Sequence, residues 1–586
     1  MIKKTKFHLA FISIVILYLA ILIRLEQKLF WQHFVYPILE IILWAYIINA
    51  IRRTNHKFSQ FIAIGVFSIF SLIYLIQISS LSLSGSLISS LALENIDQAQ
   101  TVSNSTKIFM TVVWILLIAI YYKSPKLPPT RKRTFALLSL LVILQVILIS
   151  KVIGNNDGKL RKRDIPVTNF FFFFYQHSRT KIINNLLCTP QNQQGSREKS
   201  IIYQSSPPQI EPNSGKNNVI LLFIEGFSSK LLTYSSGGEP LMPNLQQFAN
   251  QPSPQTLSIQ NYYNHTAATY RGLYGQLSST FPEVDRNKNS ELSQNIEILK
   301  NIQADSIISL LNKDNYHTVF YSTDDSENQI HSGLKTFGFT DFYTRDEVEN
   351  NIPVCEEGGH LSAESAFEGL QYVIDVTVNK TKAKHNNAPF FIATYLNSTH
   401  AFLDGKMCAS AYQGGNNIVL NRFHNMDKAF GNFLAKFKSS KLAKNTILLV
   451  TADHATFPEE PYKALFDADT QESLYFVDQI PLLINSPTHM LPKQMDAQYT
   501  NSLRLAPTLA AMLNLPQSPN DFLGNSLFDN QISETGLEKI SSLGTDFYTY
   551  QNGNVIGTKK DNRIDLIYQH YAKHRVCGIT NGPTSK

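Results

Sequence analysis

An apolar run that ends in an Asp-His pair is the feature of this chain that most constrains its fold. Residues 446–452 are β-branched and leucine-rich, and Asp453-His454 follows directly. Such runs are typical of strands buried on both faces of a parallel sheet. Ligands of open α/β sheets bind beyond the carboxyl ends of the strands. Taken alone, the pair favours a simpler interpretation, a carboxylate that caps the next helix beside an exposed histidine.

Three further apolar runs repeat this arrangement and change that interpretation. Residues 218–224 are followed by Glu225, residues 389–396 by a polar segment that ends at His400, and residues 317–321 by Ser322 to Asp325. Side chains with oxygen and imidazole nitrogen donors, gathered at one edge of a sheet, favour a divalent metal site. We therefore predict an α/β domain with a largely parallel central sheet and a metal site at the strand ends.

The first 154 residues have a different pattern, dominated by long apolar runs. Each run approaches the roughly 20 residues that a helix needs to cross a bilayer. A cleaved signal peptide at the first run is disfavoured, because no small-residue cleavage site follows it. We expect five transmembrane helices, at residues 8–23, 34–51, 61–83, 108–122 and 134–153.

The charges of the loops predict the orientation of these helices. Lysines precede the first run, and basic residues fill the loops after the second and fourth runs, whereas the loop after the third carries Glu94 and Asp97. Since basic loops stay in the cytoplasm, we expect the N-terminus inside and everything after the fifth helix outside. The net charge of +7 then reflects topology and contact with the membrane surface, and no nucleic-acid partner is needed.

Two segments separate the apolar half from the globular half. Residues 159–163 are basic and residues 170–175 are aromatic, and we expect both at the membrane surface. Residues 195–217 are rich in Gln, Ser, Pro and Asn and read as a linker. The predicted organisation is a transmembrane domain (1–154), an interfacial segment with a linker (155–217) and a globular domain (218–586).

All four cysteines fall in the part of the chain that we expect outside the membrane: Cys188, Cys355, Cys408 and Cys577. An even number in an oxidising compartment indicates two disulfides, with three possible pairings. We expect Cys355 to pair with Cys408, because both lie in polar, loop-like segments. The spacing fits no zinc motif, and exported cysteines favour a Gram-negative periplasm.

A candidate nucleophile lies between the first two predicted strands. The segment 264–276 carries Thr266, Thr269 and Arg271. A hydroxyl beside a metal ion loses its proton more readily and becomes a nucleophile, and an arginine nearby can clamp a phosphate. A threonine here suits a helix N-cap equally well.

Taken in order, these motifs resemble the lipoteichoic-acid-synthase-like and phosphoethanolamine transferase branch of the alkaline phosphatase/sulfatase superfamily. The resemblance spans nearly the whole chain and rests on the order of the motifs. The matching segments are Glu225, Met242-Pro243-Asn244-Leu245, Thr269-Tyr270-Arg271-Gly272-Leu273, His400, Asp453-His454, and the late stretches 480–483, 505–508 and 522–528.

The resemblance implies a role for each matching residue. His400 and Arg271 would bind the phosphate and assist catalysis. Thr269 would be the nucleophile, although Thr266 also fits the phosphoethanolamine transferase pattern. Asp324, Asp325 and Asn328 stand near the positions where lipoteichoic acid synthases have Trp and Arg, and Asp325 and Asn328 are candidate substrate contacts. The ligands of one divalent ion (Mn²⁺, Zn²⁺ or Mg²⁺) would be Glu225, Thr269, Asp453 and His454.

The implied activity is that of a phosphotransferase in the cytoplasmic (inner) membrane, with its catalytic domain on the periplasmic or extracellular side. It would move the head group of phosphatidylethanolamine or phosphatidylglycerol, through a phosphothreonine, to a cell-envelope glycan such as lipopolysaccharide or lipooligosaccharide. A sulfatase is disfavoured, because sulfatases convert a Cys or Ser to formylglycine and threonine cannot form that aldehyde. The alternatives are a phosphodiesterase or phosphatase with water as acceptor, and a catalytically inactive membrane scaffold.

Overall fold

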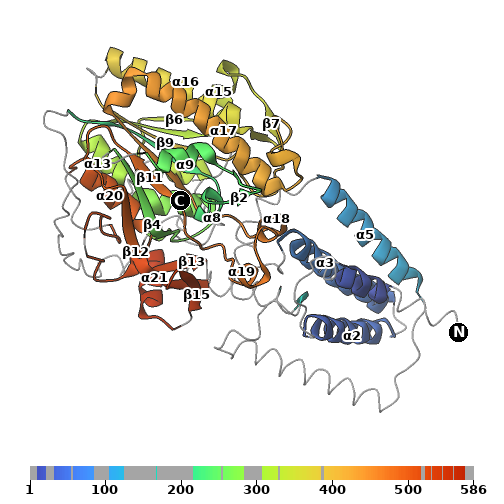
Figure 1. Ribbon diagram of the computed structural model, residues 1–586. Coiled ribbons are helices and arrows are strands. Elements are labelled where there is room, and N and C mark those ends of the chain that lie inside the picture. Colours follow the sequence, from blue (N-terminus) through green and yellow to red (C-terminus); the bar gives the residue numbers. More distant parts are fainter. Residues whose placement is uncertain are drawn as a thin grey trace, which may run out of the picture. The chain divides into compact units, whose positions relative to one another are not determined.

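The computed structural model divides into two compact units, residues 1–183 with 458–460, and residues 184–457 with 461–586. We describe each unit by itself (Figure 1). The residues that the structure describes are 10–20, 32–53, 57–84, 104–124, 166–167, 170, 215–251, 255–282, 306–326, 330–384, 388–515, 522–529, 531–543, 546–558 and 560–573.

The described part of the first unit is helical. The helices are Ala10–Ala20, α2 (Gln32–Arg53), α3 (Lys57–Ser84) and α5 (Asn104–Lys123), which overlap four of the five predicted runs. Within them, the segment Lys57–Leu81, with a mean hydropathy of 2.3, is long and apolar enough to cross a bilayer. The fifth run, 134–153, lies outside the described residues. Five transmembrane helices therefore remain a prediction.

The second unit is built on an eight-stranded sheet in the order β12-β4-β11-β10-β1-β9-β5-β6. The strand β11 is antiparallel to both its neighbours, and the other pairs in this sheet are parallel, which confirms the predicted, largely parallel α/β fold. The strands are β1 (Asn218–Ile224), β4 (Thr256–Tyr263), β5 (His317–Ser322), β6 (Asp341–Tyr343), β9 (Phe390–Leu396), β10 (Thr446–Ala452), β11 (Leu482–Asn485) and β12 (Gln494–Asn501).

Helices cover both faces of this sheet, which is why its central strands are apolar on both sides. In β1, every residue from Val219 to Ile224 is fully buried. One layer of helices, whose members contact one another, contains α9 (Pro243–Ala249), α16 (Ala363–Lys384) and α17 (Ile418–Ser439). A second such layer contains α10 (Thr269–Ser278), α13 (Ile307–Lys313), α14 (Ile330–Lys335) and α20 (Leu505–Met512).

Smaller elements complete the second unit (Figure 1). A three-stranded sheet contains β13 (Ile540–Leu543), β14 (Asp546–Gln551) and β15 (Asn554–Thr558), and two short hairpins contain β2 (Ser235–Ser236) with β3 (Glu239–Pro240) and β7 (Glu356–Glu357) with β8 (His360–Leu361). The remaining helices are α8 (Ser229–Leu232), α15 (Arg345–Val348), α18 (Glu460–Lys463), α19 (Ala468–Glu472) and α21 (Asn562–Lys573), with 3₁₀ turns at Glu349–Asn351, Tyr412–Gly414, Lys441–Asn445, Ser502–Arg504 and Leu537–Lys539.

The strand ends that matter for the site are aligned by register. Ile224 at the end of β1 lies opposite Ala452 of β10 and Leu396 of β9. The backbone N–H of the next residue, Glu225, donates to Leu396 O at 3.1 Å and so extends the pairing. The polar residues that follow these three strands therefore begin at the same edge of the sheet.

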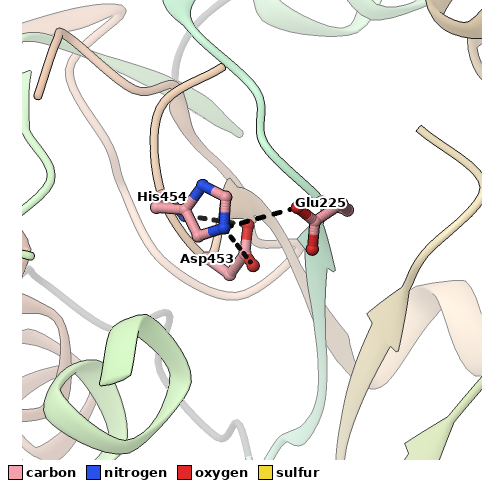
Figure 2. A group of neighbouring side chains, drawn as sticks. All are labelled: Glu225, Asp453 and His454. Carbon is pink, nitrogen blue, oxygen red and sulfur yellow. Dashed lines mark hydrogen bonds and ion pairs between the residues drawn. The ribbon is translucent and has the colours of Figure 1, made fainter. Parts of the chain in front are cut away.

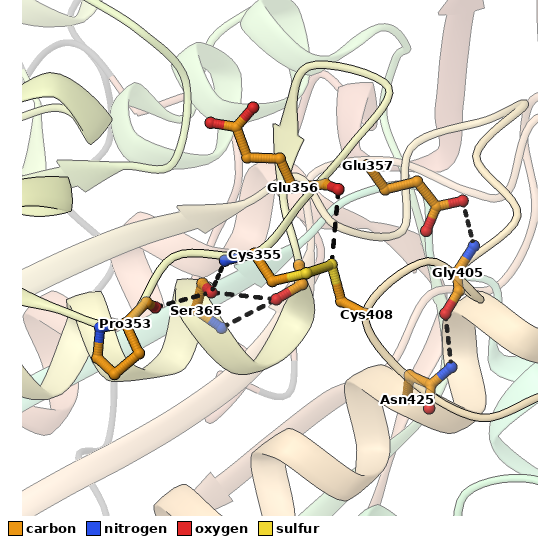
Figure 3. The surroundings of a disulfide bond; sticks show 9 residues. Pro353, Cys355, Glu356, Glu357, Ser365, Gly405, Cys408 and Asn425 are labelled. Atoms are coloured by element: carbon orange, nitrogen blue, oxygen red, sulfur yellow. Dashed lines mark hydrogen bonds between the residues drawn. A yellow bond between two sulfur atoms is a disulfide. The ribbon is translucent and has the colours of Figure 1, made fainter.

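A disulfide joins Cys355 to Cys408, with 5.9 Å between their Cα atoms, which confirms the predicted pair (Figure 3). It connects the residue before β7 to the segment between β9 and α17. Cys188 and Cys577 lie outside the described residues, so the second predicted disulfide stays a prediction.

Helix α10 is seated directly on the end of β10. The side-chain amide of Gln276 donates from Nε2 to Ala452 O at 2.9 Å and to Asp453 O at 3.0 Å. One turn earlier, Gly272 lies so close that an added Cβ would be 2.1 Å from Asp453 O. Only a residue without a side chain fits at this contact, which fixes where the N-terminus of α10 lies.

We predict that Gly272→Ala destabilises the second unit by about 2–4 kcal/mol, because the new methyl group overlaps a backbone oxygen that cannot rotate away. Chemical unfolding of the full chain measures this. The control is Gly557→Ala in β15, where no atom lies within 4 Å of the added Cβ, and a change below about 0.5 kcal/mol is expected there. Equal effects of the two substitutions would contradict the seating of α10.

Candidate active site

Glu225, Asp453 and His454, here named the carboxylate–imidazole cluster, lie together where β1 and β10 end (Figure 2). His454 Nε2 is 3.3 Å from Glu225 Oε1 and 3.2 Å from Asp453 Oδ2. One ligand atom from each residue lies within 4.8 Å of the others, and all three side chains are buried. The structure thus brings together three of the four predicted metal ligands through the parallel strand ends.

Backbone groups orient this cluster. The N–H groups of Gly226 and His454 both donate to Asp453 Oδ1, at 2.9 and 2.8 Å. Gly226 has a φ of +59°, which glycine adopts readily and which turns the chain sharply after Glu225. Asp453 Oδ2 accepts no hydrogen bond from the described residues and faces the imidazole. One oxygen of Asp453 is therefore anchored and the other is left for a ligand.

The imidazole of His454 is held in the tautomer that suits a metal ligand. Its Nδ1 lies 2.8 Å from the carbonyl oxygen of Ala455, which can only accept a hydrogen bond. The proton is therefore on Nδ1, and Nε2 presents a lone pair to the two carboxylates. The ring of Phe476 packs edge-on against the imidazole at 4.7 Å and holds its plane.

The electrostatics of the cluster favour a bound cation. Burial, together with the charge of Glu225, raises the pKa of Asp453 well above its usual range. Burial alone would also raise the pKa of Glu225, but the nearby His454 and His400 lower it to about 2. Burial lowers the pKa of His454. Converging, buried lone pairs of two carboxylates and a neutral imidazole fit a divalent metal ion.

The two candidate nucleophiles are placed differently. Thr269 is the first residue of α10, and its Oγ1 donates to Glu225 Oε2 at 2.9 Å. Thr266 Oγ1 donates instead to the carbonyl oxygen of Ser542 at 2.8 Å. Thr269, the fourth predicted ligand, therefore contacts the carboxylate–imidazole cluster through its hydroxyl, whereas the hydroxyl of Thr266 is bonded to the backbone of β13.

The predicted phosphate-binding residues come from different elements near the cluster. Arg271 is on α10 and is 5% exposed, close enough that its charge adds to burial in lowering the pKa of His454. His400 follows β9, and its ring stacks on that of His360 with 5.3 Å between the ring centroids. Its Nδ1 lies 3.0 Å from Ala401 O, which leaves Nε2 for proton exchange.

The structure describes one of the two predicted substrate contacts. Asp325 is exposed, and Asn328 lies outside the described residues. The preceding residue, Asp324, is directed inward: its side chain is 12% exposed, and its Oδ1 accepts from Asn397 Nδ2 at 2.5 Å. Burial, with a contribution from the charge of Glu225, raises the pKa of Asp324 to about 6. Of the two neighbouring aspartates, Asp324 is therefore the buried one and Asp325 the exposed one.

Two contacts of Glu225 come from residues that the sequence analysis did not single out. Tyr395 lies inside β9, and its hydroxyl donates to Glu225 Oε2 at 2.5 Å. Thr399 donates from Oγ1 to the backbone oxygen of Glu225 at 2.7 Å. A tyrosine inside a fully buried strand is itself a signal, since its hydroxyl needs a buried acceptor. Both residues help to fix the orientation of Glu225.

Comparisons with known proteins agree with this architecture. The Sulfatase family model matches residues 217–515, just over half of the 586-residue chain. A solved structure with the same fold is the integral membrane protein lipooligosaccharide phosphoethanolamine transferase A from Neisseria meningitidis. The two sequences are 11% identical, the comparison covers 91% of this chain and 95% of that chain, and the TM-score is 0.50.

Two further solved structures are similar. The lipoteichoic acid synthase LtaP from Listeria monocytogenes is 15% identical, over 62% of this chain and 93% of that chain, with a TM-score of 0.45. A protein of the alkaline phosphatase superfamily from Vibrio parahaemolyticus is 17% identical, over 67% and 94%, with a TM-score of 0.45. On the match of the family model to more than half of its residues, the chain belongs to the sulfatase family.

Proposed function

We propose that this protein is a metal-dependent phosphotransferase that carries a phospholipid head group on Thr269 and delivers it to a hydroxyl of a cell-envelope glycan. The observation that carries the proposal is the contact between Thr269 Oγ1 and Glu225 Oε2 at a buried ligand cluster. A threonine supports nucleophilic attack on phosphorus, but it cannot be converted to the formylglycine of sulfatases. Within the sulfatase family, this favours phosphoryl transfer.

Glu225, Thr269, Asp453 and His454 would hold one divalent ion, for which Mn²⁺, Zn²⁺ and Mg²⁺ all suit a set of mostly oxygen ligands with one imidazole. When bound, the ion supplies positive charge that favours the deprotonated threonine hydroxyl and offsets the charge of the phosphoryl group. Arg271, whose charge acts on His454 of the same cluster, would bind the remaining phosphate oxygens.

In the first half-reaction, Thr269 Oγ1 forms a bond to phosphorus and the bond from phosphorus to the diacylglycerol oxygen breaks. The threonine proton passes to Glu225 Oε2, which already accepts its hydrogen bond. The leaving diacylglycerol oxygen takes a proton from His400 Nε2. Tyr395 keeps Glu225 oriented through the hydrogen bond to the same Oε2 atom. The product is a phosphothreonine that carries the head group.

In the second half-reaction, a glycan hydroxyl gives its proton to His400 Nε2 and bonds to phosphorus. The bond from Thr269 Oγ1 to phosphorus breaks, and Oγ1 recovers its proton from Glu225. The residues therefore return to their starting protonation states. If water replaced the glycan, the same groups would act as a phosphodiesterase, which is the main alternative.

A phospholipid donor is insoluble in water, so an enzyme that uses it benefits from membrane helices in its first unit. Large apolar side chains of its helices are turned outward, as expected of surfaces in lipid: Phe58, Phe61, Ile108 and Phe109 are each 61–75% exposed. We propose that these helices anchor the protein in the cytoplasmic membrane with the N-terminus inside and the second unit in the periplasm. The disulfide between Cys355 and Cys408 fits that oxidising compartment.

The side chain of Asp324 favours phosphatidylethanolamine over phosphatidylglycerol as the donor. It lies at the end of β5 with His360 Nδ1 at 4.0 Å, and its charge interacts with that of His400. An inward carboxylate beside a phosphoryl-transfer site would attract the ammonium group of ethanolamine and gives no comparable advantage to glycerol. A Gram-negative compartment makes lipopolysaccharide or lipooligosaccharide the expected acceptor.

The Thr269 intermediate is tested with the full-length protein, reconstituted with a divalent metal and phosphatidylethanolamine or phosphatidylglycerol vesicles. We expect mass spectrometry to find the head-group phosphate on Thr269, to find none in Thr269→Val, and to find it retained in Thr266→Val. The second variant is a matched control, because it removes the same hydroxyl at the alternative position.

Two results would contradict the proposal. An adduct on Thr266 would show that Thr266 is the nucleophile. No adduct and no released head group with either lipid would indicate an inactive scaffold. Release of free head group in the presence of an acceptor glycan, without transfer, would support the phosphodiesterase instead.

The donor preference is tested by replacing Asp324 with Asn, which removes the charge and keeps the shape. We expect the ratio of kcat/KM for phosphatidylethanolamine to that for phosphatidylglycerol to fall about tenfold, the size expected for loss of one charge-assisted hydrogen bond. The control, Asp325→Asn at the exposed neighbour, should leave the ratio unchanged. A ratio that both variants change alike would refute the role of Asp324.

A further inference from the structure

His360 is a second histidine beside the candidate active site, and the proposed half-reactions give it no role. Its ring stacks on that of His400, with 5.3 Å between the ring centroids and 13° between the ring planes. Its Nδ1 lies 4.0 Å from Asp324 Oδ1, and its side chain is 16% exposed. The charge of Glu225 also acts on it. His360 therefore lies close to the groups that would carry out phosphoryl transfer.

The sequence around His360 sets its place in the fold. Gly358 and Gly359 form the two-residue turn between β7 and β8, with φ values of +58° and +83°. Tight hairpin turns of this kind need positive φ at both central positions, which glycine adopts readily. The register pairs His360 with Glu357, and the next residue, Leu361, is 1% exposed. His360 thus stands between a tight turn and a residue anchored in the core.

Two contacts tie this hairpin to the segment that carries His400. The disulfide joins Cys355, directly before β7, to Cys408 (Figure 3). In the same view, Glu357 Oε1 accepts from the backbone N–H of Gly405 at 2.7 Å. The two stacked rings are therefore carried by segments that are cross-linked to each other.

Arg345, at the start of α15, fixes the turn of the hairpin from a third element. Its Nη1 donates to Gly359 O at 2.9 Å, and its guanidinium forms an ion pair with Glu356. By contrast, His360 Nδ1 makes no hydrogen bond to any residue that the structure describes. Since the hairpin holds His360 in place, the stacked face of its ring is the contact through which it can act on His400.

The charge state of His360 suits this contact. Burial, with a contribution from the charge of His400, lowers the pKa of His360 to about 4, so its ring is neutral near pH 7. The proposed reaction places a proton on His400 Nε2, and two positively charged rings in a stack would repel each other. The electron-rich face of a neutral aromatic ring attracts a cation instead. A neutral His360 can therefore stack on a protonated His400.

The ring of His400 depends on this stack for its position. Among the described residues, it makes one hydrogen bond, between Nδ1 and the carbonyl oxygen of the adjacent residue, Ala401, at 3.0 Å. We propose that His360 is a positioning residue, whose stacked ring holds His400 Nε2 where it exchanges protons with the diacylglycerol oxygen and the glycan hydroxyl. This inference rests on the proposed function, and it adds a residue that acts through His400 without touching the phosphoryl group.

The first test uses two donors that differ in their need for a proton. Loading of Thr269 in the full-length protein would be followed with phosphatidylethanolamine vesicles and, separately, with the 4-nitrophenyl ester of phosphoethanolamine. Diacylglycerol is a poor leaving group unless it is protonated, whereas 4-nitrophenolate is a stable anion that leaves without a proton. We expect His360→Ala to slow loading from the lipid about tenfold, part of the roughly 10²–10⁴-fold contribution of a positioned acid, and to change loading from the ester less than about twofold.

Two further variants separate the stacked face from general damage. His360→Phe keeps an aromatic face without the nitrogens, so we expect it to load from both donors at the unsubstituted rate. His424→Ala is the matched control, because His424 of α17 also stacks on a ring, that of Tyr412 at 5.4 Å, and its Nδ1 likewise has no partner among the described residues. It should leave both rates unchanged.

Three results of the first test would overturn the proposal. His360→Ala could slow loading equally from both donors, which would indicate general damage to the site. It could leave both rates unchanged, which would remove any role for the ring. His360→Phe could slow loading from the lipid as much as His360→Ala, which would assign the role to a nitrogen atom and not to the stacked face.

The second test does not depend on the reaction. Crystal structures of the full-length protein carrying His360→Ala or His360→Phe would show the ring of His400 directly. We expect one position of this ring in the unsubstituted protein and in His360→Phe, and a displaced or second position in His360→Ala. If no adduct formed on Thr269, the proposed function would fail while this readout stayed valid. An undisturbed His400 ring in His360→Ala would overturn the positioning role itself.

Discussion

The parallel, in-register pairing of β1 with β10 is the constraint on which the candidate site depends. Because Ile224 lies opposite Ala452, the next residues, Glu225 and Asp453, leave the sheet side by side. A slip of one residue would turn one of these carboxylates to the opposite face of the sheet. The apolar packing on both faces of β1 and β10 holds this register. Buried side chains that do not touch the reacting groups therefore set the spacing of the ligand atoms.

Two contacts at the end of β9 support Glu225. Tyr395 orients Glu225 from inside the strand, and Thr399 bonds to the backbone of Glu225. The segment at the end of β9 therefore helps to hold Glu225 in place.

Much of the fold followed from the sequence, because strands buried on both faces have a distinctive composition. The predicted limits of β1 and β10 match the structure, and those of β5 and β9 differ by one residue. The contacts within the candidate site were harder to predict. The sequence pattern does not show which of Asp324 and Asp325 is buried, because the turn after β5 decides which side chain faces inward. The partner of Thr266, Ser542, lies 276 residues away, a contact that only tertiary structure reveals.

Anomalous diffraction from crystals of the full-length protein grown with Mn²⁺ tests the central claim most directly, because it locates the ion without relying on activity. The account predicts an anomalous peak about 2.0–2.2 Å from oxygens of Glu225 and Asp453 and from His454 Nε2, distances typical of such ligands. A fully occupied ion bound elsewhere, with the carboxylate–imidazole cluster empty, would contradict the account.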